Sequence, residues 1–268
     1  VDMDGKFVAI KLNFGEHGNM GYLRPQYARA LVDYISSRGG KPFLTDCNTL
    51  YPGKRKNALE HLYCAWENGF TPLTAGCPII IADGLKGTDE VDIPVVGGEY
   101  VDAAKIGRAI MDADIIISLN HFKGHEIAGF GGALNNIGMG CASRAGKKAQ
   151  HSNGKPFVKE GACRACHLCL SQCANDGLVV GDDGTVTIDE EHCVGCGRCI
   201  GACNFDAIAI PWSAATKDLN VRMAEYAKAV LDGRPHFHVS LVRDVSPFCD
   251  CHADNDVPII NDIGMFAS

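Results

Sequence analysis

Eight cysteines in the second half of the chain have the residue type and spacing to hold iron–sulfur clusters. They stand in two runs with the same spacing, Cys163-x2-Cys166-x2-Cys169-x3-Cys173 and Cys193-x2-Cys196-x2-Cys199-x3-Cys203. Four thiolates at this spacing are the ligands that a [4Fe–4S] cube takes up. The sequence therefore predicts two [4Fe–4S] clusters.

The spacing also predicts which cysteines share a cube. The first three cysteines of a run lie in one tight loop and can meet three irons of one cube, whereas the fourth points toward the other cube. Cluster I then takes Cys163, Cys166, Cys169 and Cys203, and cluster II takes Cys193, Cys196, Cys199 and Cys173. The alternative is two zinc sites, but these typically use two Cys-x2-Cys knuckles separated by a spacer.

The repeat extends beyond the cysteines, because residues 177–180 and 207–210 both alternate like short strands. Residues 157–211 resemble a bacterial two-cluster ferredoxin. The resemblance implies two short hairpins and two short helices around the cubes, and one-electron transfer at low potential. That family usually has proline after the fourth cysteine of each run, where this chain has Ala174 and Asn204. This departure leaves the cluster potentials open, but not the ligation.

The segments on either side alternate between strands and helices. Strands are predicted over residues 7–14, 42–46, 78–82, 93–96, 114–119, 236–242 and 257–261, and helices over 25–38, 57–68, 101–113, 133–141 and 219–232. This order is typical of an α/β fold with a mostly parallel sheet covered by helices. Residues after the ferredoxin-like stretch are too few to bury a core alone. We therefore expect one discontinuous α/β domain, residues 1–156 and 212–268, with residues 157–211 as a small α+β insert.

The chain stops just after a strand, so we expect a further C-terminal part beyond residue 268. Several side chains are expected in the core. In the helix that Asn57 caps, Leu59, Leu62 and Trp66 share one face. In the helix predicted over 101–113, Ile106 and Ile110 should point inward. Core positions are also predicted for Met139 and Trp212 and for the single thiols Cys47, Cys64 and Cys77.

Ligands of open parallel sheets bind beyond the carboxyl ends of the strands. The residues at these predicted ends are polar or reactive: Lys11, Asn13, Glu16, Asp46, Cys47, Asp83 and Asp262. The strand over 114–119 runs into the densest group, His121, Lys123 and His125. We predict that these three side chains are catalytic, with a histidine as the acid or base.

A glycine-rich segment follows this group. Gly129, Gly131 and Gly132 precede a predicted helix that contains Asn135. Backbone N–H groups at such a helix start favour an anion, so the segment is a candidate site for a small anionic substrate, a carboxylate or a phosphate. The alternative is a tight turn that needs glycine for steric reasons, because the segment matches neither a dinucleotide fingerprint nor a P-loop.

Cys249 and Cys251 form a separate Cys-x-Cys pair beside His252. They could hold a third metal centre, which Cys141 could join. The alternative is two reduced cysteines in a turn.

Composition limits the classes of function. The net charge of −7 argues against a nucleic-acid partner. The apolar runs are too short to span a bilayer, and residues 1–14 contain no apolar signal segment, so we expect no membrane association. Oxygen-sensitive cubes belong in a reducing compartment, which predicts an anaerobic cytoplasm.

Segments spread over nearly the whole chain resemble the uncharacterised iron–sulfur proteins of domain-of-unknown-function family 362. They are residues 11–16, 123–125, 129–132, 135–141, 249–251 and 262–264. Many members of that family carry a ferredoxin insert at this point. The glycine segment also resembles remotely the nickel-pincer lactate racemases, which act on small 2-hydroxy acids.

The leading hypothesis is therefore an iron–sulfur oxidoreductase or its electron-transfer subunit, in which two clusters feed a site for a small anionic substrate. Its redox partner would be a ferredoxin or a reductase. One alternative is a non-catalytic electron carrier or iron–sulfur assembly partner, which needs neither His121 and His125 nor the Cys249–Cys251 pair. Another is a redox-silent racemase or lyase with structural clusters.

Overall fold

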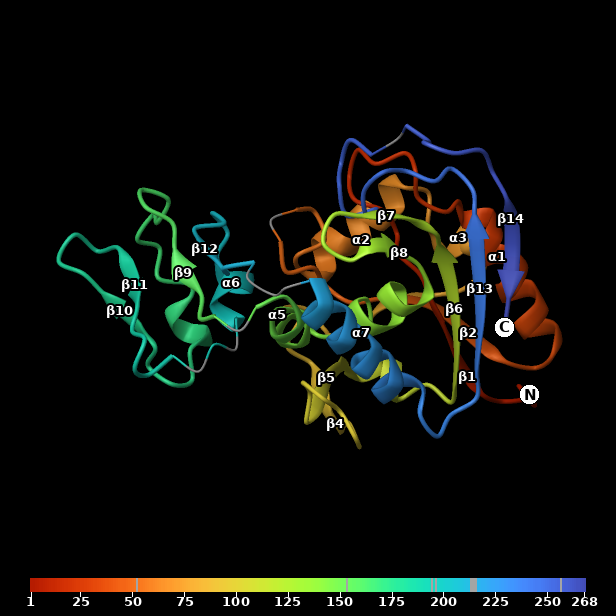
Figure 1. The fold of residues 1–268 in the computed structure, drawn as a ribbon, viewed down its shortest axis with the longest axis horizontal. Coiled ribbons are helices and arrows are strands. Elements are labelled where there is room, and N and C mark those ends of the chain that lie inside the picture. Colours follow the sequence, from red (N-terminus) through yellow and green to blue (C-terminus); the bar gives the residue numbers. More distant parts are fainter. Residues whose placement is uncertain (52, 153, 194, 196, 213–215, 256) are drawn as a thin grey trace.

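The computed structural model describes residues 1–268 except 52, 153, 194, 196, 213–215 and 256. Its centre is a six-stranded sheet with the strand order β14-β13-β6-β1-β2-β3 (Figure 1). The strands are β1 (Phe7–Lys11), β2 (Lys41–Asp46), β3 (Ile79–Ile81), β6 (Ile115–His121), β13 (His236–Val242) and β14 (Gly264–Ala267). All pairs are parallel except β13 with β14. The predicted α/β fold with a mostly parallel sheet is thus confirmed.

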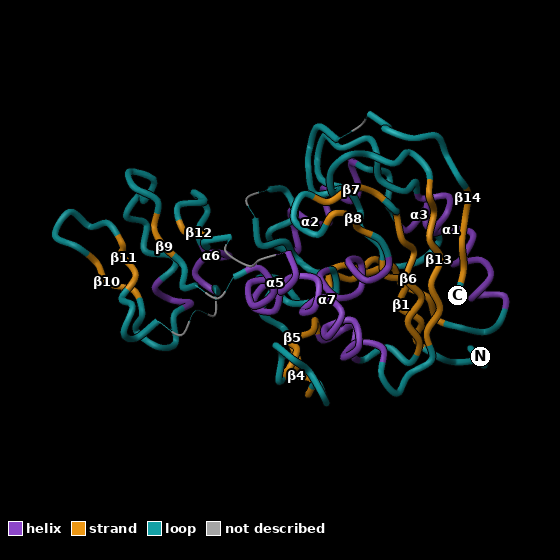
Figure 2. The backbone as a smooth tube through the Cα atoms, viewed as in Figure 1, coloured by secondary structure: helices purple, strands orange, loops and turns teal. Residues whose placement is uncertain are grey.

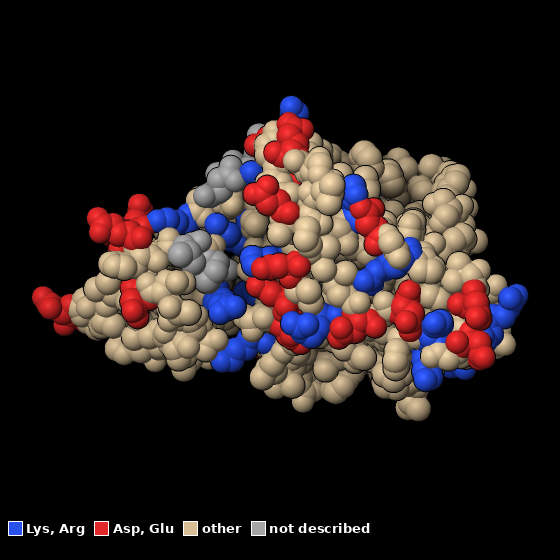
Figure 3. All heavy atoms as spheres, turned by 90° about the horizontal axis from the view of Figure 1, so that it is seen from below, with Lys and Arg blue, Asp and Glu red and all other residues tan. Residues whose placement is uncertain are grey.

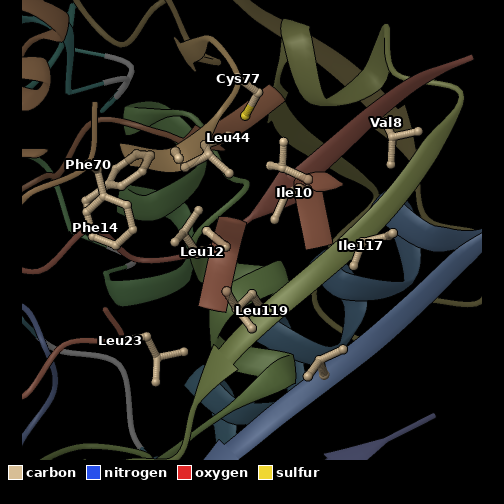
Figure 4. Close-up of a cluster of buried hydrophobic side chains, with 14 of the residues drawn as sticks. Val8, Ile10, Leu12, Phe14, Leu23, Leu44, Phe70, Cys77, Ile117 and Leu119 are labelled. Atoms are coloured by element: carbon tan, nitrogen blue, oxygen red, sulfur yellow. The ribbon is translucent and has the colours of Figure 1, made fainter. Parts of the chain in front are cut away.

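The sheet is buried on both faces because its central strands are apolar at nearly every position. Every residue of β6 is buried. Its odd-numbered residues Ile115, Ile117 and Leu119 pack with residues of β1 in one core (Figure 4), whereas Ile116 belongs to a second core on the opposite face. This continuous burial is typical of a parallel sheet between two layers of helices.

The helices of each layer come from different parts of the chain. The first core contains residues of α1 (Pro25–Ser37), α2 (Ala58–Glu67) and α3 (Pro72–Ala75). The second contains residues of α4 (Arg108–Met111), the π-helix η1 (Asn135–Met139) and α7 (Thr216–Leu231). Helix α5 (Arg144–His151) lies at the end of the sheet that faces the insert (Figure 2). Among the described residues, no helix is both long and apolar enough to cross a bilayer.

Two predicted elements are wrong. Residues 101–113 are not one helix but strand β5 (Ala103–Gly107) followed by α4. The backbone is extended here because Ala104 and Ile106 alternate inward and β5 pairs with β4 (Glu90–Pro94), outside the central sheet. Ile106 and Ile110 are nevertheless buried as expected. Residues 257–261 form no strand in the described part of that segment, and β14 occupies the sheet edge instead.

Helix α2 has its predicted cap, since the Asn57 side chain accepts a hydrogen bond from the N–H of Glu60. The predicted inner face is only partly right: Leu62 packs partly buried against the first core, but Leu59 and Trp66 are 60% and 45% exposed. The helix instead buries His61, Cys64 and Ala65. His61 packs edge-on against Phe14, with 5.8 Å between ring centroids, and this contact sets the inward face.

The predictions for other single residues are mixed. Cys47, Cys64 and Cys77 are buried, as expected. The prediction that Trp212 lies in the core is wrong, because this residue is 49% exposed. Met139 is only partly buried and borders a cavity.

Residues 157–211, here called the insert, form a lobe at one end of the molecule (Figure 1). The insert contains β9 (Phe157–Val158), the 3-10 helix η2 (Leu170–Gln172), β10 (Leu178–Val180), β11 (Val186–Ile188), α6 (Arg198–Ala202) and β12 (Ile208–Ala209). Strand β9 pairs with β12 and β10 with β11, both antiparallel. Two short strand pairs and two short helices are what the ferredoxin resemblance implies.

The insert is docked on the α/β body by specific contacts. Leu50 packs into the hydrophobic core of the insert. The Nζ of Lys56 lies 3.2 Å from the carboxylate of Asp206. Within the body, Arg144 donates to the carbonyl of Lys56 at 2.7 Å, next to this ion pair. Figure 3 shows acidic side chains at the outer end of the insert and basic ones near its junction with the body.

Candidate functional site

A cavity of about 1000 Å³ lies beyond the carboxyl ends of β1 and β2. We call it the central cavity. Its wall on the body side includes Lys11, Asn13, Glu16, Asp46, Cys47, Arg55, Lys123, His125, Asn135, Lys147, His151, Cys249 and Cys251. Asn204 and Asp206 of the insert close another side. The predicted strand-end residues, apart from Asp83 and Asp262, thus meet around one space.

The floor of the cavity is a buried ion-pair network. Lys11 on β1 places its Nζ 2.9 Å from the carboxylate of Asp46 on β2 and 2.7 Å from the Asn136 side-chain oxygen. Arg55 lies 3.6 Å from the same carboxylate. Burial alone would raise the pKa of Asp46, but the positive charges of Lys11 and Arg55 hold it below the ordinary value. Asp46 is therefore a carboxylate at neutral pH.

Arg55 is a site residue that the sequence reasoning missed. It is 1% exposed, and it donates to the side chains of Asn13 at 2.7 Å and Tyr51 at 2.6 Å. The Tyr51 hydroxyl in turn donates to Glu16 at 2.9 Å. Burial raises the pKa of Tyr51 well above its usual value. No sequence pattern identifies Arg55, because it stands in a basic stretch that is typical of an exposed loop.

His121 does not reach the cavity. Its Nδ1 is 3.0 Å from both carboxylate oxygens of Asp250, and its Nε2 is 2.8 Å from the Arg243 carbonyl. Both ring nitrogens therefore face oxygen atoms of the protein and not the cavity. His121 therefore positions Asp250 rather than a bound molecule.

Lys123 and His125 do line the cavity. The Nζ of Lys123 is 3.5 Å from Asp250. Burial would lower the pKa of Lys123, but Asp250, Cys249 and Cys251 raise it above the ordinary value. The His125 Nδ1 accepts from the N–H groups of residues 127 and 128 at 3.2 and 3.1 Å. This fixes the hydrogen of neutral His125 on Nε2, the nitrogen available for proton transfer.

Only one residue of the predicted anion site borders the central cavity. Gly129 and Gly131 belong to strand β8 (Gly129–Gly131), which pairs with β7 (Lys123–His125). Neither they nor Gly132 border the central cavity, whereas Asn135 does. Further along, a Cβ at Gly138 would lie 2.0 Å from the Met223 carbonyl. Gly138 therefore lets η1 pack closely against α7. The steric alternative for the predicted anion segment rests instead on Gly129, which has a φ of 85°.

Cys249 and Cys251 stand two positions apart in the chain and both line the cavity. Hydrogen bonding by the Cys251 thiol, together with the charge of Lys123 and against the effect of burial, lowers the pKa of Cys249 to about 6. Among the described residues, no group of three or more Cys, His, Asp or Glu side chains could hold a single metal ion. Cys141 lies in the second hydrophobic core and does not border the cavity.

The cysteines of the insert gather in two further pockets. One is lined by Cys163, Cys166, Cys169 and Cys203, the other by Cys173, Cys193 and Cys199. Cys196 lies outside the described residues. These are the crossed sets that the spacing predicts, as far as the described residues go. Four thiols around one pocket fit the donor set of a cube, which takes one thiolate per iron.

The backbone around these pockets repeats as the sequence does. Residues 165 and 167 in the first run and 195 and 197 in the second all have positive φ, between 52° and 73°. At one of these positions, the N–H of Gly195 lies 3.4 Å from the Cys193 Sγ. Other backbone N–H groups of the insert also reach sulfur. The N–H of Val186 lies 3.4 Å from the Cys163 Sγ, and that of Gly177 lies 3.2 Å from the Cys173 Sγ. Such bonds to the ligand sulfurs tune cluster potential.

Helix α5 supplies two more residues that the sequence reasoning missed. Lys147 is buried and donates to the carbonyls of Gly140 and Ala142 at 3.3 and 2.5 Å. His151 donates from Nδ1 to the Lys147 carbonyl at 3.0 Å and packs edge-on against Trp212. Burial lowers the pKa of His151 to about 4, so its ring is neutral at pH 7. The helix itself gave no apolar pattern from which to predict it.

Asp83 is buried and does not border the cavity. Its carboxyl group should make the stability of the fold depend on pH. Its carboxylate accepts from the backbone and side-chain nitrogens of Asn48 at 2.9 and 2.8 Å. Burial raises its pKa from 3.8 to about 6, with Lys147 opposing the shift. The folded state therefore binds this proton more tightly than the unfolded state. The stabilisation is complete below pH 3.8 and is lost as the pH rises through about 6.

We expect Asp83→Asn to remove this slope. The variant should gain about 1–3 kcal/mol of unfolding free energy relative to wild type at about pH 8, and much less at about pH 4. Urea titrations at both pH values measure the difference. Asn in place of the exposed Asp112 serves as the control. An equal difference at the two pH values would contradict the assignment.

A family model described as Domain of unknown function (DUF362) matches residues 8–268. Among curated proteins, one of the subunits of the Na(+)-translocating ferredoxin:NAD(+) oxidoreductase complex of Acetobacterium woodii is 27% identical over 138 residues, which are 45% of this chain and 39% of that protein. The chain thus spans well under half the length of this relative.

Two solved structures are similar at lower identity. The match to the lactate racemase apoprotein from Thermoanaerobacterium thermosaccharolyticum covers 98% of this chain and 46% of that one, with a TM-score of 0.48 and 13% identity. The match to a protein from Thermotoga maritima covers 90% and 47%, with a TM-score of 0.44 and 11% identity.

Proposed function

The chain belongs to the DUF362 family, and from this premise we propose that it is an iron–sulfur protein in which two [4Fe–4S] clusters deliver electrons to a small anionic substrate in the central cavity. The similarity to a component of a ferredoxin:NAD(+) oxidoreductase complex supports electron transfer. The two cysteine-lined pockets support the number of clusters and the crossed ligand sets. When bound, each cube supplies or accepts one electron.

One observation carries the proposal: the central cavity is bounded both by the strand ends and by the insert. Asn204 follows Cys203 directly in the chain, so the turn that carries a predicted ligand of cluster I also forms the cavity wall. The Lys56–Asp206 ion pair holds this turn against the body. A cluster bound at Cys203 would therefore lie beside the cavity.

The cavity offers cations for an anion and a group for proton transfer. Lys147 donates to two carbonyls, and no carboxylate ion pair is found for it among the described residues, so its charge is available to a bound anion. Lys123 contributes a second buried cation, and Asn135 an amide. His125 is the proposed acid or base. Gly129, Gly131 and Gly132 remain a predicted anion site that does not border this space.

We further propose that a ferredoxin or a reductase exchanges electrons with the insert. Cys166 is exposed, so cluster I would have an edge close to the surface where a partner docks. The predicted cytoplasmic location fits such a partner and remains a prediction.

The test combines metal analysis with anion binding. Protein purified without oxygen should contain about eight irons and eight sulfides per chain, and dithionite should reduce both cubes. Calorimetry with oxalate, phosphate and acetate then probes the cavity. Lys147→Gln should weaken binding of the tightest of these anions about tenfold or more, because one charge-assisted hydrogen bond is lost.

Two further variants make the result interpretable. Lys54 lines the same cavity but is exposed, so Lys54→Gln should fold normally and still weaken binding. Lys217→Gln, on the exposed start of α7, should bind as wild type does. Failure of all three anions to bind would exclude the anion site, and absence of reducible iron would exclude the electron-transfer role.

A further inference from the structure

Cys249 and Cys251 are a pair of thiols to which the proposed function gives no role. They line the central cavity and are separated in the chain by one residue, Asp250. Cys249 is 7% exposed and Cys251 is partly buried. A small molecule therefore reaches the pair through the cavity that also holds Lys123 and His125.

The pair has too few partners for a metal ion but enough for a disulfide. A protein-bound zinc ion takes three or four protein ligands, and the described residues offer no such group here. The neighbouring His252 is paired with Glu126. A disulfide requires only two sulfurs, and Cys249 and Cys251 stand two positions apart in the chain and line the same cavity.

The surroundings favour thiol exchange. The buried cation Lys123 lines the same cavity as Cys249, and a cation beside a thiol favours the thiolate, the form that attacks a disulfide. A disulfide between Cys249 and Cys251 would close a ring over the single residue Asp250. Such a short ring is strained, and strained disulfides are easily reduced.

We propose that Cys249 and Cys251 form a reversible dithiol–disulfide couple, which collects one electron from each cluster and passes the two as a pair to an anionic disulfide in the central cavity. This inference rests on the proposed function, because the clusters supply the electrons. Each of the two clusters in the insert carries one electron. Together they supply the two electrons that the Cys249–Cys251 disulfide in the body accepts.

Both steps balance. In the first, the Cys249–Cys251 S–S bond takes up two electrons and two protons from solvent and becomes two thiols, while each reduced cube is oxidised by one electron. In the second, the two thiols break the S–S bond of the substrate. Two substrate thiols leave with the two protons, and the Cys249–Cys251 bond forms again.

An anaerobic electron count tests the couple. The cluster-loaded protein is treated with oxidised glutathione, which is an anionic disulfide, freed of it by gel filtration, and titrated with dithionite. Wild type should take up about four electrons per chain, two in the cubes and two in the disulfide. The double variant C249S/C251S should take up about two, with unchanged cube absorbance. Cys77 is buried in the core away from the cavity, so C77A should behave as wild type.

Alkylation and a charge-reversed disulfide complete the test. Iodoacetamide should alkylate two more cysteines in wild type after reduction than before. In C249S/C251S, reduction should not change the number of alkylated cysteines. Cystamine, a cationic disulfide, should oxidise the pair at least about tenfold more slowly than oxidised glutathione, since Lys123 faces it.

The outcomes separate the two proposals. Wild type that takes up only two electrons, with both cubes reducible, overturns the couple and leaves the proposed function standing. A metal that co-purifies with wild type and is lost in C249S/C251S overturns it as well. Cubes that cannot be reduced overturn the proposed function itself.

Discussion

Replacing Asp46 with alanine should lower the unfolding free energy by about 3–5 kcal/mol, because it leaves two buried cations without their shared carboxylate. Lys11 is 1% exposed with its Nζ 2.9 Å from Asp46, and Arg55 is 1% exposed at 3.6 Å. Neither cation can move to solvent without opening the cavity floor. A urea titration followed by tryptophan fluorescence measures the loss.

The same variant should change the acid limb of stability. The folded-state pKa of Asp46 lies below 3.8. Its stabilisation is therefore present above pH 3.8 and is lost as the pH falls through the folded-state value. Wild type should lose stability in that acid range more steeply than Asp46→Ala.

A surface ion pair provides the matched control. Asp33 lies 2.7 Å from Arg29 on α1, but the two side chains are 59% and 46% exposed. Asp33→Ala should cost less than about 1 kcal/mol, because solvent screens the pair and hydrates the remaining charge. Similar losses for Asp46→Ala and Asp33→Ala would mean that the cavity floor is solvated and not a buried network.

The sequence predicted the components of the cavity better than their arrangement. Lys11, Asn13 and Asp46 could be predicted because a parallel sheet brings the carboxyl ends of its strands together. His121 and His125 looked equivalent, since both stand just beyond the strand predicted over 114–119. Only the fold shows that His121 is hydrogen bonded to Asp250, which lies in a loop 129 residues away in the sequence. Long-range pairing of this kind leaves no local pattern.

The errors in the fold have a similar physical cause. Residues 101–113 contain small and apolar side chains that suit a helix. Ala103–Gly107 are nevertheless a strand, because they pair with β4, which comes from another segment of the chain. On α2, the periodicity of Leu59 and Trp66 was as good as that of His61 and Cys64. The packing of His61 against Phe14 decided between the two faces. Local propensity is a weak guide where tertiary contacts choose between near-equal alternatives.

The arrangement of the cluster ligands should be decided by the iron content of double variants. If the sets are crossed, Cys163 and Cys203 bind the same cube. Cys163→Ala, Cys203→Ala and the double variant should then each keep about four of eight irons. Cys163 and Cys173 would bind different cubes, so Cys163→Ala/Cys173→Ala should lose nearly all iron.

An uncrossed arrangement, in which each run holds its own cube, predicts the reverse for both pairs. Retention of iron in Cys163→Ala/Cys203→Ala is the informative result, because loss of iron can also follow from misfolding, whereas a remaining cube requires a folded half of the insert. The pocket lined by Cys163, Cys166, Cys169 and Cys203 favours the crossed arrangement. In that arrangement each run supplies a ligand to both cubes, so the clusters are held together by the same backbone. Cys203 then joins cluster I to the turn at Asn204 that borders the central cavity, and its loss should slow any transfer of electrons from the insert to the body.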